Sequence, residues 1–346
     1  MRPTQPEGVR ASGGTASFGA TGAARPWTAS TRRQLCGMPR ALQKAAMLTL
    51  APRNDAALEG GPVPKLVRTP CGPVECTVSG DGPALLALHG AMGGHDQSLL
   101  LVRTLGLAGF RCVAVSRPGY LGTPLRAGCR PEEQADLYRD LLEALAVRRV
   151  AVLAVSGGGP SALEFAIRHP GRCWGAVIVS SVCARNDVRL PFAWYTMKLL
   201  ARCGPLLAAQ RRAISRDPER AARRSIPDPA LRARTVADPV AGPLLKELQV
   251  STLGRMPLRL PGTENDIAVT RGTLNLALER ITAPVLVVHG TADRVAPFAQ
   301  GQAIAARIPG AELLAIEGGD HVAIFTHLAK VRDRVGRFLR AHAPPD

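Results

Sequence analysis

Between residues 83 and 182, short apolar runs alternate with amphipathic segments, and this alternation restricts the chain to few folds. Runs such as 83-PALLALHG-90 and 148-RRVAVLAV-155 have the composition of buried strands. The segments between them repeat their apolar residues at helical spacing, and the same pattern resumes at residue 284. Strands that alternate with helices form a mostly parallel sheet covered on both faces, so we predict an α/β fold.

The expected elements follow from these runs and from the Gly and Pro residues that end them. An opening hairpin is expected over 67–80, and the first amphipathic helix is expected to stop at Gly109. The other strands are expected at 83–90, 110–116, 148–155, 173–182, 284–290 and 311–316, and the helices at 96–109, 130–147, 159–170, 299–310 and 322–342.

Two segments fall outside this pattern. Residues 183–280 are rich in Arg and Pro and carry only short helical patches, so we predict a helical cap inserted between core segments 61–182 and 281–346. Residues 1–60 are predicted to be a disordered or mis-annotated tail. Their Arg-rich stretch faintly resembles a twin-arginine export signal, but no long hydrophobic region follows it.

The net charge of +17 is large, but its composition does not indicate a nucleic-acid or membrane partner. Of the 44 basic residues 39 are Arg, in a chain also rich in Ala, Gly and Pro, which is typical of codon bias in a GC-rich genome. Aromatic residues make up only 4%, which leaves few stacking platforms, and we expect no nucleic-acid partner. No apolar run is long enough for a membrane span. The eight cysteines form no CxxC pair, so we expect a reducing, cytoplasmic location and no metal site.

Ser156 stands where an apolar strand runs into a glycine-rich turn and then a helix, 152-VLAVSGGGPSALEFA-166. Small residues two positions on either side, Ala154 and Gly158, are typical of a nucleophile elbow, which lifts a serine hydroxyl above the sheet edge. A phosphate-binding loop is the alternative. It is disfavoured because 157-GGGPSA-162 lacks the third Gly of the dinucleotide motif and no P-loop Lys follows.

A serine nucleophile needs a base and a group that orients the base, and both have candidates at later strand ends. Asp293 follows the apolar run 284–290, and His321 follows the run 311–316. The order Ser, Asp, His agrees with an α/β-hydrolase, and the 137-residue gap from Ser156 to Asp293 contains the predicted cap. Asp320 is adjacent to His321 in sequence, so its side chain is expected to point elsewhere.

An acyl-transfer site also needs donors for the oxyanion, each worth roughly 3–4 kcal/mol. The elbow supplies the backbone N–H of Gly157, and the loop 89-HGAMGG-94 supplies Ala91 or, as a weaker candidate, Met92. His89 is expected to orient this loop. Asp266 in the cap is an alternative acid, which we rank below Asp293.

From about residue 65 to 342 the chain resembles the α/β-hydrolase superfamily. The likeness is carried by HGAMGG, SRPGYLGTP, AVSGGGPSA, VVHGTADRVAP and GGDHVAIF, at 89–94, 116–124, 154–162, 287–297 and 318–325. The resemblance implies an eight-stranded, mostly parallel sheet, a cap after the sixth strand, a Ser156–His321–Asp293 triad, and no metal or organic cofactor. Haloalkane dehalogenases and epoxide hydrolases of this fold use Asp at the elbow, and Ser156 argues against both.

The expected activity is serine hydrolysis of a small ester, thioester, lactone or amide. Carbon–carbon bond hydrolysis, cofactor-free perhydrolase activity and a non-catalytic ligand-binding role remain alternatives. The cap carries 17 basic and 9 acidic residues, which an anionic substrate or an acidic membrane surface would exploit. The candidates for lining an apolar substrate pocket are Phe192, Trp194, Tyr195, Met197 and Leu199, with Trp194 and Tyr195 foremost, although the helical spacing of this set fits cap-to-core packing equally well.

Overall fold

The computed structural model describes residues 62–187 and 192–345. Predictions for residues 1–60, including the tail and its export-like stretch, therefore lie outside the described residues. Within the described ranges, no helix combines the length and apolarity needed to cross a bilayer.

One eight-stranded sheet organises this part of the chain, in the order β1-β2-β4-β3-β5-β6-β7-β8. β2 is antiparallel to both of its neighbours, and every other pairing is parallel, so the predicted mostly parallel sheet is confirmed. The strands are β1 (Lys65–Thr69), β2 (Gly72–Ser79), β3 (Ala84–Leu88), β4 (Arg111–Val115), β5 (Val150–Val155), β6 (Cys173–Val179), β7 (Val285–Gly290) and β8 (Glu312–Ile316).

Helices cover both faces of this sheet. Alternate residues of β3 divide between them: Leu86 and Leu88 join the core under α4, α5 and α12, and Leu85 and Ala87 join the core under α3 and α14. This two-residue alternation follows from the pleat of a strand, and burial on both faces explains why the run is apolar throughout. The helices are α3 (His95–Leu105), α4 (Pro131–Ala144), α5 (Gly159–Arg168), α12 (Phe298–Arg307), α13 (Ala323–Thr326) and α14 (Leu328–His342).

Two predicted helices end differently in the structure. The helix expected to stop at Gly109 ends at Leu105, because Gly106 adopts the left-handed conformation (φ 66°) and its N–H caps the last turn. The closing helix is divided into α13 and α14 at His327, whose backbone is non-helical (φ −128°).

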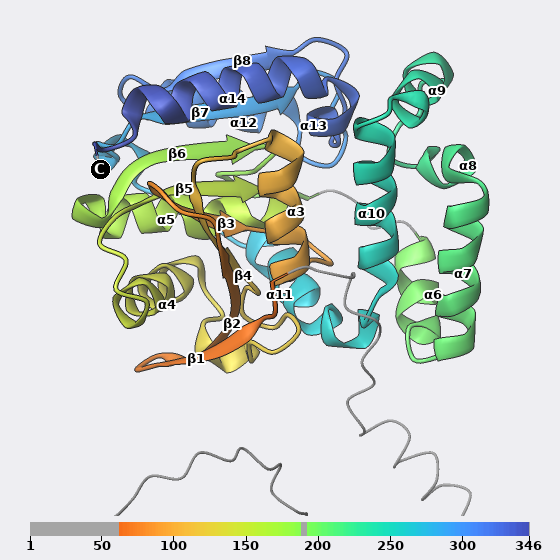
Figure 1. The fold of residues 1–346 in the computed structure, drawn as a ribbon, viewed down its shortest axis with the longest axis horizontal. Coiled ribbons are helices and arrows are strands. Elements are labelled where there is room, and N and C mark those ends of the chain that lie inside the picture. The colour runs from red at the N-terminus through yellow and green to blue at the C-terminus, as the bar shows by residue number, and fades with distance from the viewer. Residues whose placement is uncertain (1–61, 188–191, 346) are drawn as a thin grey trace, which may run out of the picture. The chain divides into compact units, whose positions relative to one another are not determined.

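Between β6 and β7 the regular elements of the described residues are all helices, as expected for a cap. Figure 1 shows α6 to α10 beyond the arrowheads of β5 and β6, on the side of the sheet where those strands end. The boundaries at 183 and 280 stay a prediction. The helices are α6 (Phe192–Leu200), α7 (Gly204–Arg216), α8 (Pro218–Ala222), α9 (Pro229–Ala237), α10 (Ala241–Leu253) and α11 (Leu260–Arg271).

Candidate active site

Three side chains follow the carboxyl ends of three parallel strands. Ser156 comes directly after β5, Asp293 three residues after β7, and His321 five residues after β8. Because β5, β6, β7 and β8 are parallel neighbours, these ends lie at one edge of the sheet. Residues separated by 137 and 28 positions in the sequence therefore meet there.

The backbone at Ser156 is held in the left-handed region, with φ 51°. A side chain rarely adopts this conformation, and the turn persists because its surroundings fix it. The Ser181 hydroxyl donates to the Ser156 carbonyl at 2.8 Å. A Cβ on Gly158 would lie 2.8 Å from the carbonyl oxygen of His89, and one on Gly90 would lie 3.1 Å from the Cβ of Ser156. Close backbone approach thus requires a glycine at 158, and Gly90 packs tightly against the serine side chain.

A chain of hydrogen bonds joins the three side chains. Ser156 Oγ lies 3.0 Å from His321 Nε2, and His321 Nδ1 lies 2.9 Å from Asp293 Oδ2. With the ring proton on Nδ1, the imidazole donates to the carboxylate and leaves Nε2 to accept the serine proton. The geometry is that of a nucleophile, a base and an orienting acid.

Asp293 is fixed by its own loop. Its Oδ1 accepts the backbone N–H groups of Val295 at 2.8 Å and Ala296 at 2.9 Å. Burial alone would raise the pKa of this carboxyl, but hydrogen bonding and charge from His321 outweigh burial and hold the pKa below its usual value. His289 lies 3.5 Å from Asp293 Oδ2, but its Nε2 donates to the Ala296 carbonyl, and burial lowers its pKa, which favours the neutral ring.

The loop 89–94 lies against the elbow and distinguishes the two oxyanion-donor candidates. The backbone N–H of Met92 already donates to Thr263 Oγ1 at 2.9 Å. No group among the described residues accepts from the N–H of Ala91, and Ala91 is exposed. His89 Nδ1 donates to the Gly90 carbonyl at 2.6 Å, and its Nε2 accepts the Arg117 N–H at 3.0 Å. This tautomer requires a neutral ring, and burial, reinforced by the charge of Arg117, lowers the pKa of His89 well below its usual value.

Asp266, the alternative acid, is engaged elsewhere. Its carboxylate forms a bidentate pair with Arg117, including an Nη1–Oδ1 bond of 2.9 Å, and accepts the Tyr120 hydroxyl at 2.6 Å. It still lies close to the elbow, because a Cβ on Gly157 would come within 2.7 Å of Asp266 Oδ2. This buried pair was not predicted from the sequence. Arg117 lies within the motif SRPGYLGTP, and that motif was the available signal.

A cavity of about 640 Å³ lies among α6, α7, α8 and α10 and reaches Val322, the residue after His321. Its walls are mainly apolar, and Arg220 and Arg224 also line it. Of the predicted lining residues, Met197 is on its walls beside Thr196, and Trp194 and Tyr195 are not. Trp194 packs against the cluster around Met92 and Met256, and Tyr195 is 56% exposed. Successive residues of a helix face different directions, so Met197 faces this cavity while Trp194 and Tyr195 do not, and substrate binding by these residues stays a prediction.

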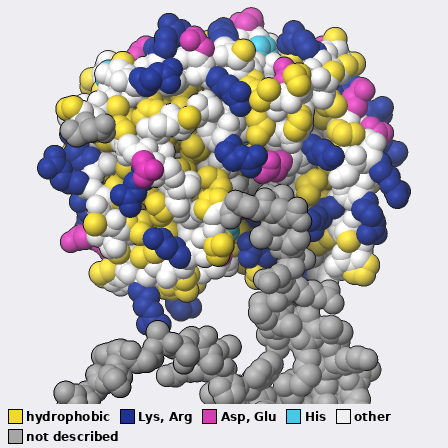
Figure 2. Space-filling view, viewed as in Figure 1, with side chains coloured by type: hydrophobic (Ala, Val, Ile, Leu, Met, Phe, Trp, Pro, Cys, Tyr) yellow, Lys and Arg dark blue, Asp and Glu magenta, His cyan; other side chains and the backbone are white. Residues whose placement is uncertain are grey.

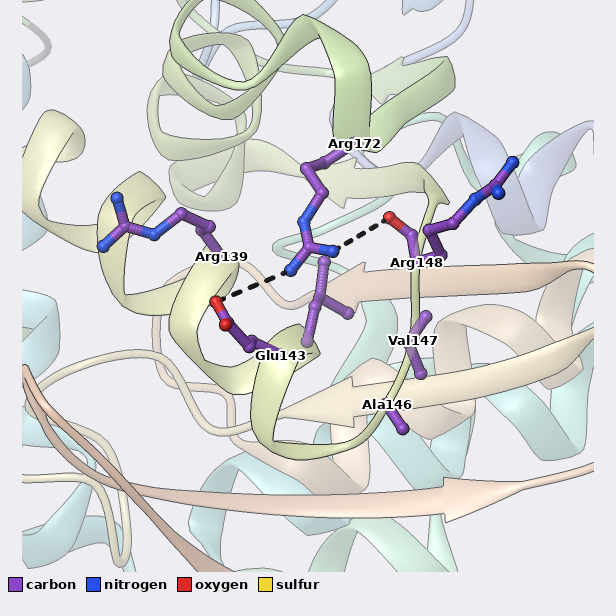
Figure 3. Close-up of a pocket in the computed structure, with 7 residues that line it drawn as sticks. Arg139, Glu143, Ala146, Val147, Arg148 and Arg172 are labelled. Carbon is purple, nitrogen blue, oxygen red and sulfur yellow. Dashed lines mark hydrogen bonds and ion pairs between the residues drawn. The ribbon is translucent and has the colours of Figure 1, made fainter.

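A second depression, of about 560 Å³, has no part in this site. Figure 3 shows its Arg139, Arg148 and Arg172, with Arg172 bonded to the Arg148 carbonyl at 3.3 Å and near Glu143. Arg148 precedes β5 and Ser156 follows it, so the six-residue strand, about 20 Å long at ~3.3 Å per residue, separates the two. On the face in Figure 2, Lys and Arg are scattered among other side chains and form no continuous stripe.

Comparisons with known proteins identify the family to which this fold belongs. The profile of the alpha/beta hydrolase fold family matches residues 83–328. An alpha/beta hydrolase fold protein from Nakamurella multipartita is 36% identical, with a TM-score of 0.72 over 81% of this chain and 99% of its own. An enol-lactonase from Burkholderia xenovorans shares the fold, with 18% identity and a TM-score of 0.59 over 80% of this chain and all of its own. A 2-hydroxy-6-oxononadienedioate/2-hydroxy-6-oxononatrienedioate hydrolase from Cupriavidus pinatubonensis is 27% identical over 278 residues, 77% of this chain and 90% of the relative.

Proposed function

The chain belongs to the α/β-hydrolase fold family, and we propose that within this family it is a serine hydrolase that cleaves a small acyl substrate. One observation carries the proposal: the hydrogen-bond chain from Ser156 Oγ through His321 to Asp293, at 3.0 and 2.9 Å, on a strained strand-to-helix turn.

The proposed reaction begins when His321 Nε2 takes the proton of Ser156 as Oγ attacks the substrate carbonyl. The imidazolium that forms is stabilised by Asp293, whose lowered pKa keeps it ionised at neutral pH. His321 then protonates the leaving group, which departs and leaves an acyl-enzyme. The same ring next activates water, and hydrolysis of the acyl-enzyme regenerates Ser156.

The negative oxygen of each tetrahedral intermediate needs two donors. We assign the backbone N–H groups of Gly157 and Ala91. Gly157 follows the nucleophile, and the N–H of Ala91 has no acceptor in the described part of the chain. Met92 is unsuited because its N–H is already bonded to Thr263.

The cavity beside Val322 is the proposed site for the rest of the substrate. Its 640 Å³ fits a small organic molecule, and most of its wall is apolar. Arg220 and Arg224 give it cationic groups for which no carboxylate partner occurs among the described residues, while Asp217 on the same wall caps α8. This wall favours a substrate with an apolar body and an anionic end.

Carbon–carbon bond hydrolysis is the second candidate. It is supported by relatives named as 2-hydroxy-6-oxononadienedioate hydrolases, whose named substrates are dicarboxylates. The two candidates differ in the bond that is cleaved. A panel of p-nitrophenyl esters and a 2-hydroxy-6-oxo-dienoate, compared by kcat/KM, distinguishes them.

Covalent labelling tests the proposal itself. A fluorophosphonate probe is expected to label wild-type protein at Ser156, with no label on Ser156→Ala and weak label on His321→Ala. Ser180→Ala is the matched control, because Ser180 also ends a strand with a left-handed backbone (φ 47°) and its hydroxyl has no hydrogen-bond partner among the described residues. Folded wild-type protein that takes no label would overturn the serine mechanism and favour a ligand-binding role.

A further inference from the structure

Met92 connects the loop of the proposed oxyanion hole to the cap. Its backbone is left-handed (φ 60°) and its side chain is buried. Its N–H donates to Thr263 Oγ1 at 2.9 Å, and its carbonyl accepts from Gln97 Nε2 at 3.3 Å and Arg259 Nη1 at 3.4 Å. Thr263 and Arg259 follow Met92 by 171 and 167 positions, so a distant segment holds this strained residue.

The position of Met92 matters because of the two peptide groups on either side of Ala91. A trans peptide is planar, with its C=O and N–H pointing in opposite directions, so a bond to one group orients the other. His89 Nδ1 holds the Gly90 carbonyl and thereby orients the N–H of Ala91. Thr263 Oγ1 holds the N–H of Met92 and thereby orients the next peptide. The core therefore fixes one side of the donor residue, and α11 fixes the other.

Thr263 is itself rigidly placed. Its Oγ1 lies 3.0 Å from the Arg259 carbonyl and 3.3 Å from the Tyr120 hydroxyl, and donating its one proton to the nearer Arg259 carbonyl leaves Oγ1 to accept from Met92. Arg259 is 2% exposed and forms a bidentate pair with Asp96 at 3.1 and 2.7 Å. The start of α11 is also tied to the core by the backbone bond from Gly262 N–H to the Gly119 carbonyl at 2.9 Å.

We infer that Thr263 is a positioning residue of the hydrolase, and that its hydroxyl holds the loop 89–94 so that the N–H of Ala91 points at the oxyanion. This inference rests on the proposed function. Without the hydroxyl, the buried N–H of Met92 loses its acceptor, and the left-handed backbone there is held only through its carbonyl, by the longer bonds from Gln97 and Arg259. The loop then relaxes and the donor leaves its position. Loss of this donor destabilises the transition state more than the ground state, because the substrate oxygen carries a negative charge only in the transition state.

Thr263→Val removes the hydroxyl that accepts from the Met92 N–H and keeps the shape of the side chain. The substrate is p-nitrophenyl acetate, and rates are divided by the concentration of sites titrated with the fluorophosphonate. We expect kcat to fall roughly 10- to 100-fold, which is less than the ~10²–10³-fold loss caused by removing a whole oxyanion donor. KM should stay within about two-fold, and the Ki of trifluoroacetophenone, which forms a tetrahedral adduct, should rise with the loss in kcat/KM. Thr263→Ser retains the hydroxyl and should restore most of kcat.

Thr270→Val is the matched control. Thr270 lies on the same helix and its hydroxyl donates to the Asp266 carbonyl at 2.8 Å, as that of Thr263 does to Arg259, but it has no bond to the loop 89–94. Its kcat should match wild type. If Thr263→Val does not fold, Thr263→Cys takes its place, because a thiol is a weak acceptor of similar size.

The outcomes separate this inference from the proposed function. Wild-type protein that neither labels nor turns over an ester refutes the proposed function. An active wild type with unchanged kcat and Ki in folded Thr263→Val, or in Thr263→Cys if that variant is needed, refutes only the role of Thr263. Equal losses in Thr263→Val and Thr270→Val would also refute it, since they would indicate a general effect on α11.

Discussion

Replacing Asp293 with Asn changes the proposed triad by one atom, and the surrounding donors dictate how the new amide lies. Two backbone N–H groups, from Val295 and Ala296, point at Oδ1 from 2.8 and 2.9 Å. An NH₂ group in that position would face two donors, so the amide oxygen must remain there. The NH₂ group is then forced into the position of Oδ2, 2.9 Å from His321 Nδ1.

This orientation reverses the polarity of the histidine. With an NH₂ donor facing it, Nδ1 of His321 has to accept, and the ring proton moves to Nε2. That proton then faces Ser156 Oγ, 3.0 Å away, so the ring no longer accepts the serine proton. The negative charge that stabilises the imidazolium is lost as well. A wrong tautomer of this kind lowers kcat by about 10⁴-fold, or ~5.5 kcal/mol in the activation barrier.

The assay is ester hydrolysis per folded protein, together with the rate of fluorophosphonate labelling. Asp320→Asn is the control, because Asp320 neighbours His321 in sequence but its Oδ1 accepts the Val322 N–H at 3.0 Å. We expect Asp320→Asn to retain wild-type activity within about three-fold. An Asp293→Asn variant with more than about a tenth of wild-type kcat would refute the tautomer argument, and so would an equal loss in both variants.

Three further predictions follow from the geometry around the site. Gly157→Ala should lower kcat, measured per titrated site, roughly 10- to 100-fold. The new Cβ would lie 2.7 Å from Asp266 Oδ2 and displace the backbone N–H that is the proposed oxyanion donor. An unchanged kcat would contradict the assignment of Gly157 as a donor. The pKa of Asp96 is lowered to about 2, because its ion pair with the buried Arg259 outweighs the effect of its own partial burial. Asp96 should therefore add about 2 kcal/mol to the free energy of unfolding above pH ~4, and this contribution should be lost as the pH falls toward 2. Urea unfolding of wild type and Asp96→Asn should therefore converge in acid, and a constant difference would refute this. Arg220→Gln and Arg224→Gln should each reduce the preference in kcat/KM for an ester with a distal carboxylate over its neutral isostere by about two- to five-fold, and an unchanged ratio would exclude charge recognition.

Much of the fold was predictable because its signals are local. The strands and helices repeat apolar residues with periods that a short window detects, and the eight-stranded, mostly parallel sheet is confirmed. Ser156, Asp293 and His321 were found because a parallel sheet brings its strand ends to one edge. Gly158 was predictable too, since a strained turn leaves no room for a side chain.

Helix ends were less predictable, since both Gly106 and Gly109 adopt a left-handed backbone and are able to end α3, and the structure ends the helix at the first of them. Composition was misleading for two residues in particular. The arginines were interpreted as a diffuse surface property, yet Arg117 and Arg259 are among the largest fully buried side chains. Charge alone does not separate them from the exposed arginines of the cap.

The sequence by itself determined the individual strands and the turn at Ser156, because each depends on neighbours a few positions away, and the three candidate catalytic residues were selected because each follows such a strand. The tertiary structure alone decided which backbone N–H remained without an acceptor, and which wall of the cap faced the cavity. The bond from Met92 to Thr263 spans 171 positions, and the pair of Arg117 with Asp266 spans 149. Such contacts arise only after the cap has packed against the core, so no local pattern in the sequence encodes them.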